Sequence, residues 1–105
     1  MKFLTIATVK DAFRTLPQAE QKRLWDGNVQ WTVDLKKKMG DKIDFYVVAG
    51  GSRMVSIGEF NSVEEYAQAI QSPPMAQAGF INYESDPLIE LDEKTLDTWI
   101  ESLKQ

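Results

Sequence analysis

A pair of glycines between two strand-like segments is the feature that most constrains the fold of this chain. Residues 43–49 and 53–60 are rich in β-branched and aromatic side chains, and Gly50-Gly51 lies between them. Such a pair predicts a hairpin with a two-residue turn and a positive φ at both glycines. Two antiparallel strands are therefore expected in the middle of the sequence.

The turn also predicts which residues share a face, because it fixes the register of the two strands. Val47 is expected opposite Met54, and Phe45 opposite Ser56. We assign this apolar or small face to the helices, because Ser56 and Gly58 allow a helix to pack closely. The other face is half apolar and carries Asp44, Tyr46, Val48, Arg53, Val55, Ile57 and Glu59.

The remaining elements follow from hydrophobic periodicity and from capping residues. They are a strand at 3–9, a helix from Pro17 to Met39 with Gly40 as its cap, a helix that begins at the Ser62 capping box and ends at Pro73-Pro74, a strand at 80–84, a short extension at 88–91 and a last helix capped by Asp92. This order predicts an α+β fold, a ferredoxin-like βαββαβ sandwich with a C-terminal helix. Residues 1–105 are expected to form a single domain.

Helices in this topology cover one face of the sheet only. The other face, with Tyr46, Val48, Val55 and Ile57, is too apolar to be left in water. A second copy of the same sheet would cover it through a symmetric contact. The sequence therefore predicts a homodimer or a larger homo-oligomer.

Composition excludes several classes of function. The chain has no His and no Cys, which excludes His-based triads, thiolate chemistry, His-ligated haem and most transition-metal sites. We expect no metal and no cofactor. The net charge of -4 argues against a nucleic-acid partner. No segment is long enough to span a membrane, no signal peptide is recognisable, and a cytoplasmic location is expected.

The segment from Val47 to Glu65 resembles muconolactone isomerase and its relatives in its strand, Ala-Gly pair, strand, Ser-Val and helix. Thr8-Val9-Lys10 and Pro73-Pro74 are similar to that family in position, and the resemblance extends to about Leu91. It implies a dimeric α+β barrel, often assembled into larger rings, with a pocket for a small organic acid or lactone.

The chain departs from the isomerase pattern at two positions. The pattern carries a His just after the Ala-Gly pair and an Arg shortly before it, and Gly51 and Val47 stand there in this sequence. These replacements argue against muconolactone isomerisation itself and against related chemistry that depends on His.

Asn28 is the first candidate for a binding residue. It lies on the apolar stripe of the first helix, where a buried amide must find hydrogen-bond partners. One interpretation is a structural bond to a backbone group or to Ser56. The other is a polar anchor in a pocket walled by Trp25, Trp31 and Phe45.

Tyr46 and Arg53 form a second candidate pair on the other sheet face. One interpretation is that they pack between subunits. The functional alternative is that they bind the carboxylate of a ligand. Lys10 is a further possible anion ligand, and Tyr83 and Glu84 are possible proton carriers.

Together these features predict a protein that binds a small, anionic or aromatic organic molecule. Isomerase-like catalysis without His is one version of this function, and no catalytic residue is assigned. The alternative is a non-catalytic module of the same fold, for ligand binding or for assembly.

Overall fold

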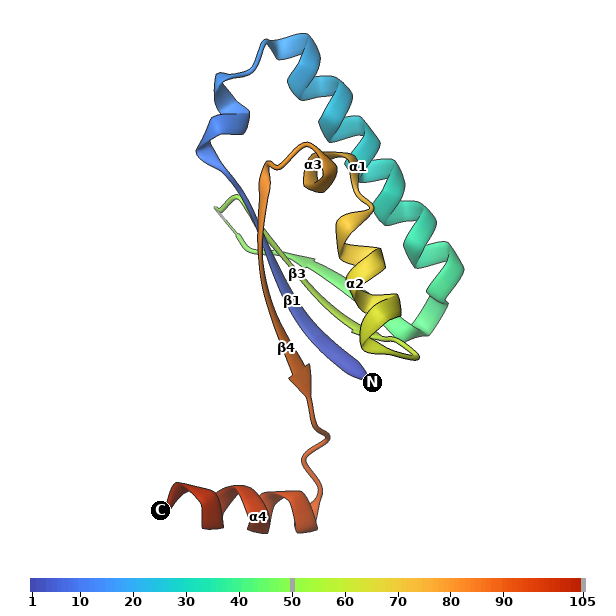
Figure 1. Cartoon of the computed structure of the whole chain (residues 1–105). Helices are drawn as coiled ribbons and strands as arrows, with labels where there is room; N and C mark the ends of the chain where they lie inside the picture. Colours follow the sequence, from blue (N-terminus) through green and yellow to red (C-terminus); the bar gives the residue numbers. More distant parts are fainter. Residues whose placement is uncertain (50, 105) are drawn as a thin grey trace.

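The computed structural model describes residues 1–49 and 51–104, which form a sheet with helices on one face (Figure 1). The strands are β1 (Lys2–Val9), β2 (Ile43–Val47), β3 (Arg53–Glu59) and β4 (Ile81–Leu88). They pair antiparallel in the order β2-β3-β1-β4. With α1 and α2 on one side, this is the predicted ferredoxin-like arrangement.

The register of the hairpin is as predicted, but its turn is different. Val47 pairs with Met54, and Phe45 pairs with Ser56. The predicted positive φ is wrong at Gly51, and Gly50 lies outside the described residues. Instead, the Gly51 N–H donates to Val48 O at 3.1 Å, and the Val48 N–H donates to Arg53 O at 3.1 Å. A longer connection centred on the same point preserves the strand pairing.

The long helix α1 (Gln18–Met39) lies between Pro17 and Gly40, as predicted. Gly40 has a φ of 59°, a value that suits a residue without a Cβ. The helix packs against two core clusters. One contains Phe3, Ile43, Phe60 and Tyr66, and the other contains Phe13, Leu24 and Met75. Short 3-10 turns at Asp11–Thr15 and Gly40–Lys42 connect α1 to the sheet.

The second helix, α2 (Val63–Gln71), begins at the predicted cap, where Ser62 Oγ accepts the Glu65 N–H at 3.1 Å. The proline pair ends it, but a short helix that the sequence did not predict, α3 (Pro74–Gln77), follows at once. Pro74 suits its first turn because that position needs no N–H donor. This turn brings Met75 into the core, where it is 0% exposed.

The fourth strand is longer than the predicted segment 80–84. It continues through Pro87, which pairs with Phe3, and ends at Leu88. A proline is tolerated here because β4 is an edge strand, where one side of the backbone has no neighbour. The extension predicted at 88–91 is wrong, since only Leu88 belongs to a strand.

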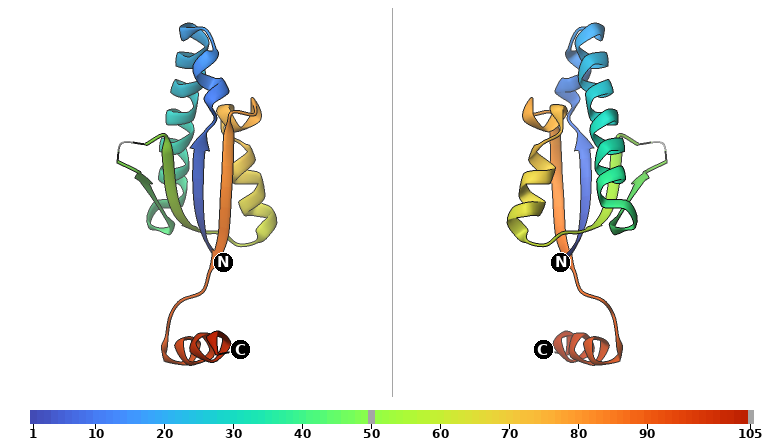
Figure 2. Two further views of the ribbon diagram at one scale, coloured as in Figure 1. Left: turned by 90° about the vertical axis from the view of Figure 1, so that its left-hand side faces the viewer. Right: turned by 90° about the vertical axis from the view of Figure 1, so that its right-hand side faces the viewer.

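The C-terminal helix α4 (Glu93–Leu103) begins at Asp92, whose carboxylate accepts the Thr95 N–H at 2.7 Å. Figures 1 and 2 show that α4 lies beyond the end of the sheet, apart from the other helices. Among the described residues, no helix is both long and apolar enough to cross a membrane.

Candidate functional site

A pocket of about 300 Å³ lies between α1 and the β2–β3 hairpin. We call it the α1–hairpin pocket. Its floor comes from the helix-covered face of the sheet, including Ala7, Met54 and Ile81, and one wall comes from α1. The full lining is Ala7, Val9, Trp25, Asn28, Val29, Thr32, Val33, Val47, Gly51, Ser52, Arg53, Met54, Met75 and Ile81. A mostly apolar site with a few polar groups is typical of small-molecule pockets.

Asn28 joins the wall of this pocket to α3. Its Oδ1 accepts the Met75 N–H at 2.8 Å, which satisfies a free donor in the first turn of the short helix. Gly27 provides a notch beside it, because a Cβ there would lie 3.0 Å from Pro74 Cγ. The structural interpretation of Asn28 therefore holds for its oxygen, with a backbone partner. No bond from its Nδ2 to another described residue is present, so this donor is free to serve the pocket.

Arg53 is the one ionisable side chain among the described lining residues. It is the first residue of β3 and is exposed, and its pairing with Thr8 places it on the uncovered sheet face, at the edge of the pocket lining. Because a guanidinium pairs with a carboxylate through two hydrogen bonds, this position suits the acid group of a ligand. The described lining contains no carboxylate, Lys or Tyr, so it holds no evident proton carrier.

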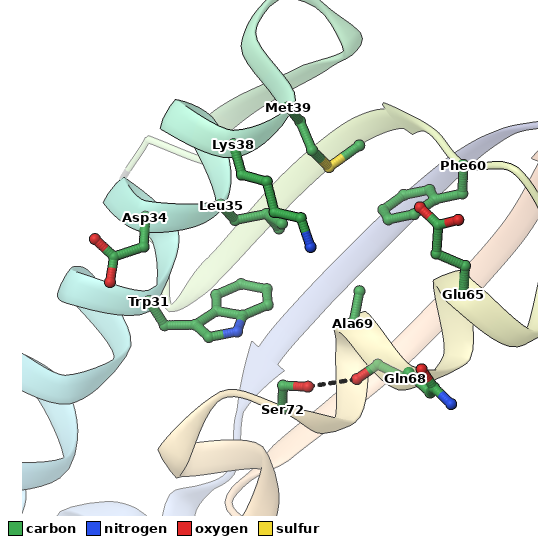
Figure 3. A pocket seen from close by; sticks show the side chains of 10 residues that line it. All are labelled: Trp31, Asp34, Leu35, Lys38, Met39, Phe60, Glu65, Gln68, Ala69 and Ser72. Atoms are coloured by element: carbon green, nitrogen blue, oxygen red, sulfur yellow. Dashed lines mark hydrogen bonds between the residues drawn. The ribbon is translucent and has the colours of Figure 1, made fainter.

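A second cavity, the α1–α2 cleft, lies on the opposite flank of α1 and has a volume of about 360 Å³ (Figure 3). Trp31, Leu35, Met39, Phe60 and Ala69 give it an apolar base. Charged and polar groups surround that base, namely Asp34, Lys38, Glu65, Gln68 and Ser72. Figure 3 shows Lys38 extending over the cleft from α1 and Glu65 facing it from α2. Charges of both signs next to water can offset one another without a ligand.

The structure brings together only part of the predicted set of candidates. Trp25, Asn28 and Arg53 line the α1–hairpin pocket, whereas Trp31 lines the α1–α2 cleft. Tyr46 lies on the uncovered sheet face, is 54% exposed and pairs with Val55. Arg53 shares that face, as predicted, but Tyr46 does not belong to the lining of the α1–hairpin pocket.

Two other expected members of the Asn28 site also lie elsewhere. Ser56 faces the helices between Phe45 and Thr5, outside both linings. Phe45 packs against the first core cluster. The sequence predicted that Trp25, Asn28 and Trp31 would face one pocket. In the structure, α1 separates two cavities, and these residues line different ones.

Tyr83, which the sequence suggested as a proton carrier, pairs with Ala7 on the sheet face that forms the pocket floor. Burial, with a smaller contribution from Tyr66, raises the pKa of the Tyr83 phenol to about 12. The phenol therefore stays protonated at neutral pH and cannot act there as a base. Glu84, the other candidate, is the neighbouring strand residue and faces the opposite side of the sheet.

Sequence reasoning missed Val33, Met75 and Ile81 as lining residues of this pocket. Val33 follows Trp25 and Val29 at helical spacing, so the pattern carried a usable signal for it. Met75 carried none, because it reaches the pocket only through the unpredicted α3.

Known proteins resemble this chain in structure. No protein-family model matches it, and neither does any curated protein sequence. The crystal structure of muconolactone isomerase superposes with a TM-score of 0.72 over 89% of this chain and 93% of that chain, at 20% identity. The chain has a muconolactone isomerase-like fold.

A second enzyme shares this fold. It is 5-chloro-2-hydroxyhydroquinone dehydrochlorinase from Burkholderia phenoliruptrix AC1100, solved in complex with 2,5-dihydroxybenzoquinone. Its TM-score is 0.62 over 87% of this chain and 96% of that chain, at 13% identity. The isomerase-like fold predicted from the sequence is thus confirmed, and at these identities the likeness extends to the fold alone.

Proposed function

We propose that the chain binds a small, anionic, aromatic molecule in the α1–hairpin pocket. In this proposal Arg53 holds the acid group, Trp25 contacts the ring, and Asn28 Nδ2 donates to a polar substituent. The observation that carries it is a mostly apolar pocket whose described lining includes one amide, Asn28, and one cation, Arg53, at its edge. A volume near 300 Å³ is at the lower end for ligand pockets, which favours a molecule with a single ring.

The position of the pocket supports the proposal independently. Gly51 and Val47, where the resemblance to the isomerases would place His and Arg, both belong to its lining. The two structural neighbours are named for reactions of a lactone and of a chlorinated hydroquinone, and one of them holds a benzoquinone. A pocket in the same fold with its polar side chains exchanged is consistent with a related ligand and different chemistry.

Binding without proton transfer is the version that the geometry favours. The described lining offers a cation and amide or hydroxyl groups, but no side chain that titrates near neutral pH. Isomerase-like catalysis would need a proton carrier from outside this lining.

The binding test compares benzoate with benzamide, which has the same ring but no charge, by isothermal titration calorimetry. Wild type should prefer benzoate. Arg53→Met should lose roughly tenfold or more in benzoate affinity, as expected when a charged hydrogen bond is removed, and should change little for benzamide. Arg14→Met, an exposed arginine outside the pocket lining, is the matched control and should bind like wild type. Equal benzoate affinity in Arg53→Met and wild type would contradict the proposal.

We also propose that the uncovered sheet face associates with a second copy. Its centre consists of Leu4 opposite Ile57 and Ile6 opposite Val55, on the two inner strands. Analytical ultracentrifugation at micromolar concentration should show no dominant monomer, and Val55→Asp should produce one or unfold the chain. A monomeric wild type would contradict this part of the proposal.

A further inference from the structure

The C-terminal arm, residues 88–103, is a large apolar surface without a cover. Leu88, Ile89, Leu91, Trp99, Ile100 and Leu103 are all exposed, with Ile89 at 80% and Trp99 at 55%. The helix α4 in this arm nevertheless has a good N-cap, because the Asp92 carboxylate accepts hydrogen bonds from both the N–H and the hydroxyl of Thr95. An amphipathic helix draws most of its stability from packing of its apolar face, so a surface for α4 to rest on is expected.

The arm has a defined charge pattern. Leu96, Trp99, Ile100 and Leu103 share one face of α4. Glu93, Asp97 and Glu101, spaced four residues apart, form an acidic row along one edge of that face. Lys94 is the base within α4, and Nζ of Lys104, the residue after the helix, lies 3.6 Å from Oε2 of Glu101. A surface for α4 should thus be apolar, with basic residues beside it.

Helix α1 presents such a surface. Trp25, Val29 and Val33 recur every four residues and are 52%, 50% and 41% exposed, and Val47 of β2 is exposed as well. We call these four residues the α1 strip. Lys22 and Lys36 stand on the same helix face at its two ends, each within reach of an acid of its own chain, Asp26 and Asp44. All four strip residues also line the α1–hairpin pocket, so the pocket is open on this side.

The arm does not cover the α1 strip of its own chain, because α4 lies beyond the end of the sheet (Figures 1 and 2). It leaves the sheet at Leu88, whereas the pocket meets β4 at Ile81, seven residues earlier, or about 23 Å along the strand. Strand β4 is at one edge of the sheet and β2 at the other, so three strand spacings, about 14 Å, must also be crossed. The linker 89–92 spans at most about 14 Å and α4 adds about 16 Å, so only the far end of a fully extended arm would reach the strip of its own chain. The arm of another copy can lie along the whole strip without this extension.

The uncovered sheet face is the competing surface, and its charges disfavour the arm. Asp44, Glu59, Glu84 and Asp86 surround its apolar centre, against Lys2 and Arg53 as bases. An acidic row along α4 would be repelled there, whereas the ends of the α1 strip are lysines.

We infer that α4 of one copy docks on the α1 strip of a second copy and closes the α1–hairpin pocket from outside. Trp99 and Ile100 then pack on Trp25, Val29 and Val33, and the acidic row approaches Lys22 or Lys36. The docking requires no ligand, whereas its consequence for the pocket rests on the proposed function. A ligand would be enclosed only in the assembled protein.

The absence of native cysteines makes a direct test possible. Val29→Cys and Ile100→Cys, at the middle of each surface, are prepared separately in the full chain, one of them labelled with ¹⁵N. After mixing and mild oxidation, mass spectrometry should find the mixed disulfide dimer as the main product. Both side chains are exposed, so both variants should melt like wild type when reduced. Thr98→Cys, on the opposite face of α4, replaces Ile100→Cys in the control and should give several times less mixed dimer.

Two outcomes would overturn the inference. In one, Ile100→Cys couples preferentially to Ile57→Cys on the sheet face, which would place the arm there. In the other, Ile100→Cys and Thr98→Cys couple equally to Val29→Cys, which would mean that the arm has no fixed place. A failure of benzoate to bind leaves this test unaffected, so the docking and the ligand proposal fail separately.

Discussion

The two flanks of α1 border cavities of similar size but opposite character. The α1–hairpin pocket has apolar walls, an asparagine whose oxygen is already bonded and an arginine at the edge of its lining. The α1–α2 cleft has an apolar base but is surrounded by acids, an amide and a lysine. The number of polar groups therefore does not identify the better binding site. Polar groups that already bond to each other and to water contribute little binding free energy when a ligand replaces those partners. A few polar groups that still lack a hydrogen-bond partner contribute more.

The largest expected difference between the two flanks is in stability. Met75 is 0% exposed and joins the pocket wall to the second core cluster, whereas Met39 in the cleft is partly buried. Met75→Ala should cost about 2–5 kcal/mol through lost burial and a new cavity. The melting temperature should fall by roughly 4–8 °C for each kcal/mol. Met39→Ala should cost clearly less in the same calorimetric melts, and equal losses would contradict the difference in packing between the two cavities.

Asn28 separates the structural role of the pocket wall from its binding role. Asn28→Leu leaves the Met75 N–H without its acceptor and should cost about 1–3 kcal/mol. Asn28→Asp keeps an acceptor for that N–H but removes the Nδ2 donor. It should therefore retain most of the stability and lose benzoate affinity, because a second carboxylate repels the ligand. A variant with Asp that is as unstable as the Leu variant would argue against the bond to Met75.

The two tryptophans of α1 provide a matched pair for binding. Trp25→Leu removes a ring from the α1–hairpin pocket, and Trp31→Leu removes one from the cleft. An aromatic contact is worth about 0.5–1.5 kcal/mol beyond buried area, so Trp25→Leu should weaken benzoate binding by up to roughly tenfold. Trp31→Leu should leave the affinity unchanged. The reverse result by calorimetry would move the site to the cleft.

The smallest effect concerns Tyr83, which lies on the helix-covered sheet face next to the pocket lining, at alkaline pH. The folded pKa of Tyr83 is about 12, above its ordinary value of 10.0, so unfolding releases a proton once the pH exceeds that ordinary value. The contribution of Tyr83 to stability is complete below about pH 10 and is lost as the pH rises toward 12. Denaturant titrations between these limits should show wild type losing more stability than Tyr83→Phe. Parallel losses in the two proteins would show that Tyr83 is not the cause.

The sequence predicted the sheet better than it predicted the pocket, for a physical reason. Strand pairing depends on where the hairpin is centred, and the observed connection is centred on Gly50-Gly51 as expected, although its turn differs. The caps at Ser62 and Asp92 are local interactions and were also predictable.

The pocket depends on contacts between distant segments. Asn28 was recognisable as an unusual residue on an apolar stripe, but its hydrogen-bond partner Met75 is 47 residues away. Met75 belongs to a helix of one turn, which is too short to be predicted from hydrophobic periodicity. The position of α4 away from the other helices was equally unpredictable. Its periodic apolar face predicts that the helix packs against something, but not against which surface.

The most direct test of the binding proposal uses the wild-type chain and its indole signals. The three tryptophans lie in different places: Trp25 in the α1–hairpin pocket, Trp31 in the α1–α2 cleft and Trp99 in the C-terminal arm. In a benzoate titration followed by ¹⁵N–¹H correlation spectra, the Trp25 indole N–H should shift with saturation while that of Trp31 stays in place. A Trp31 signal that moves while the Trp25 signal does not would contradict the assignment of the site.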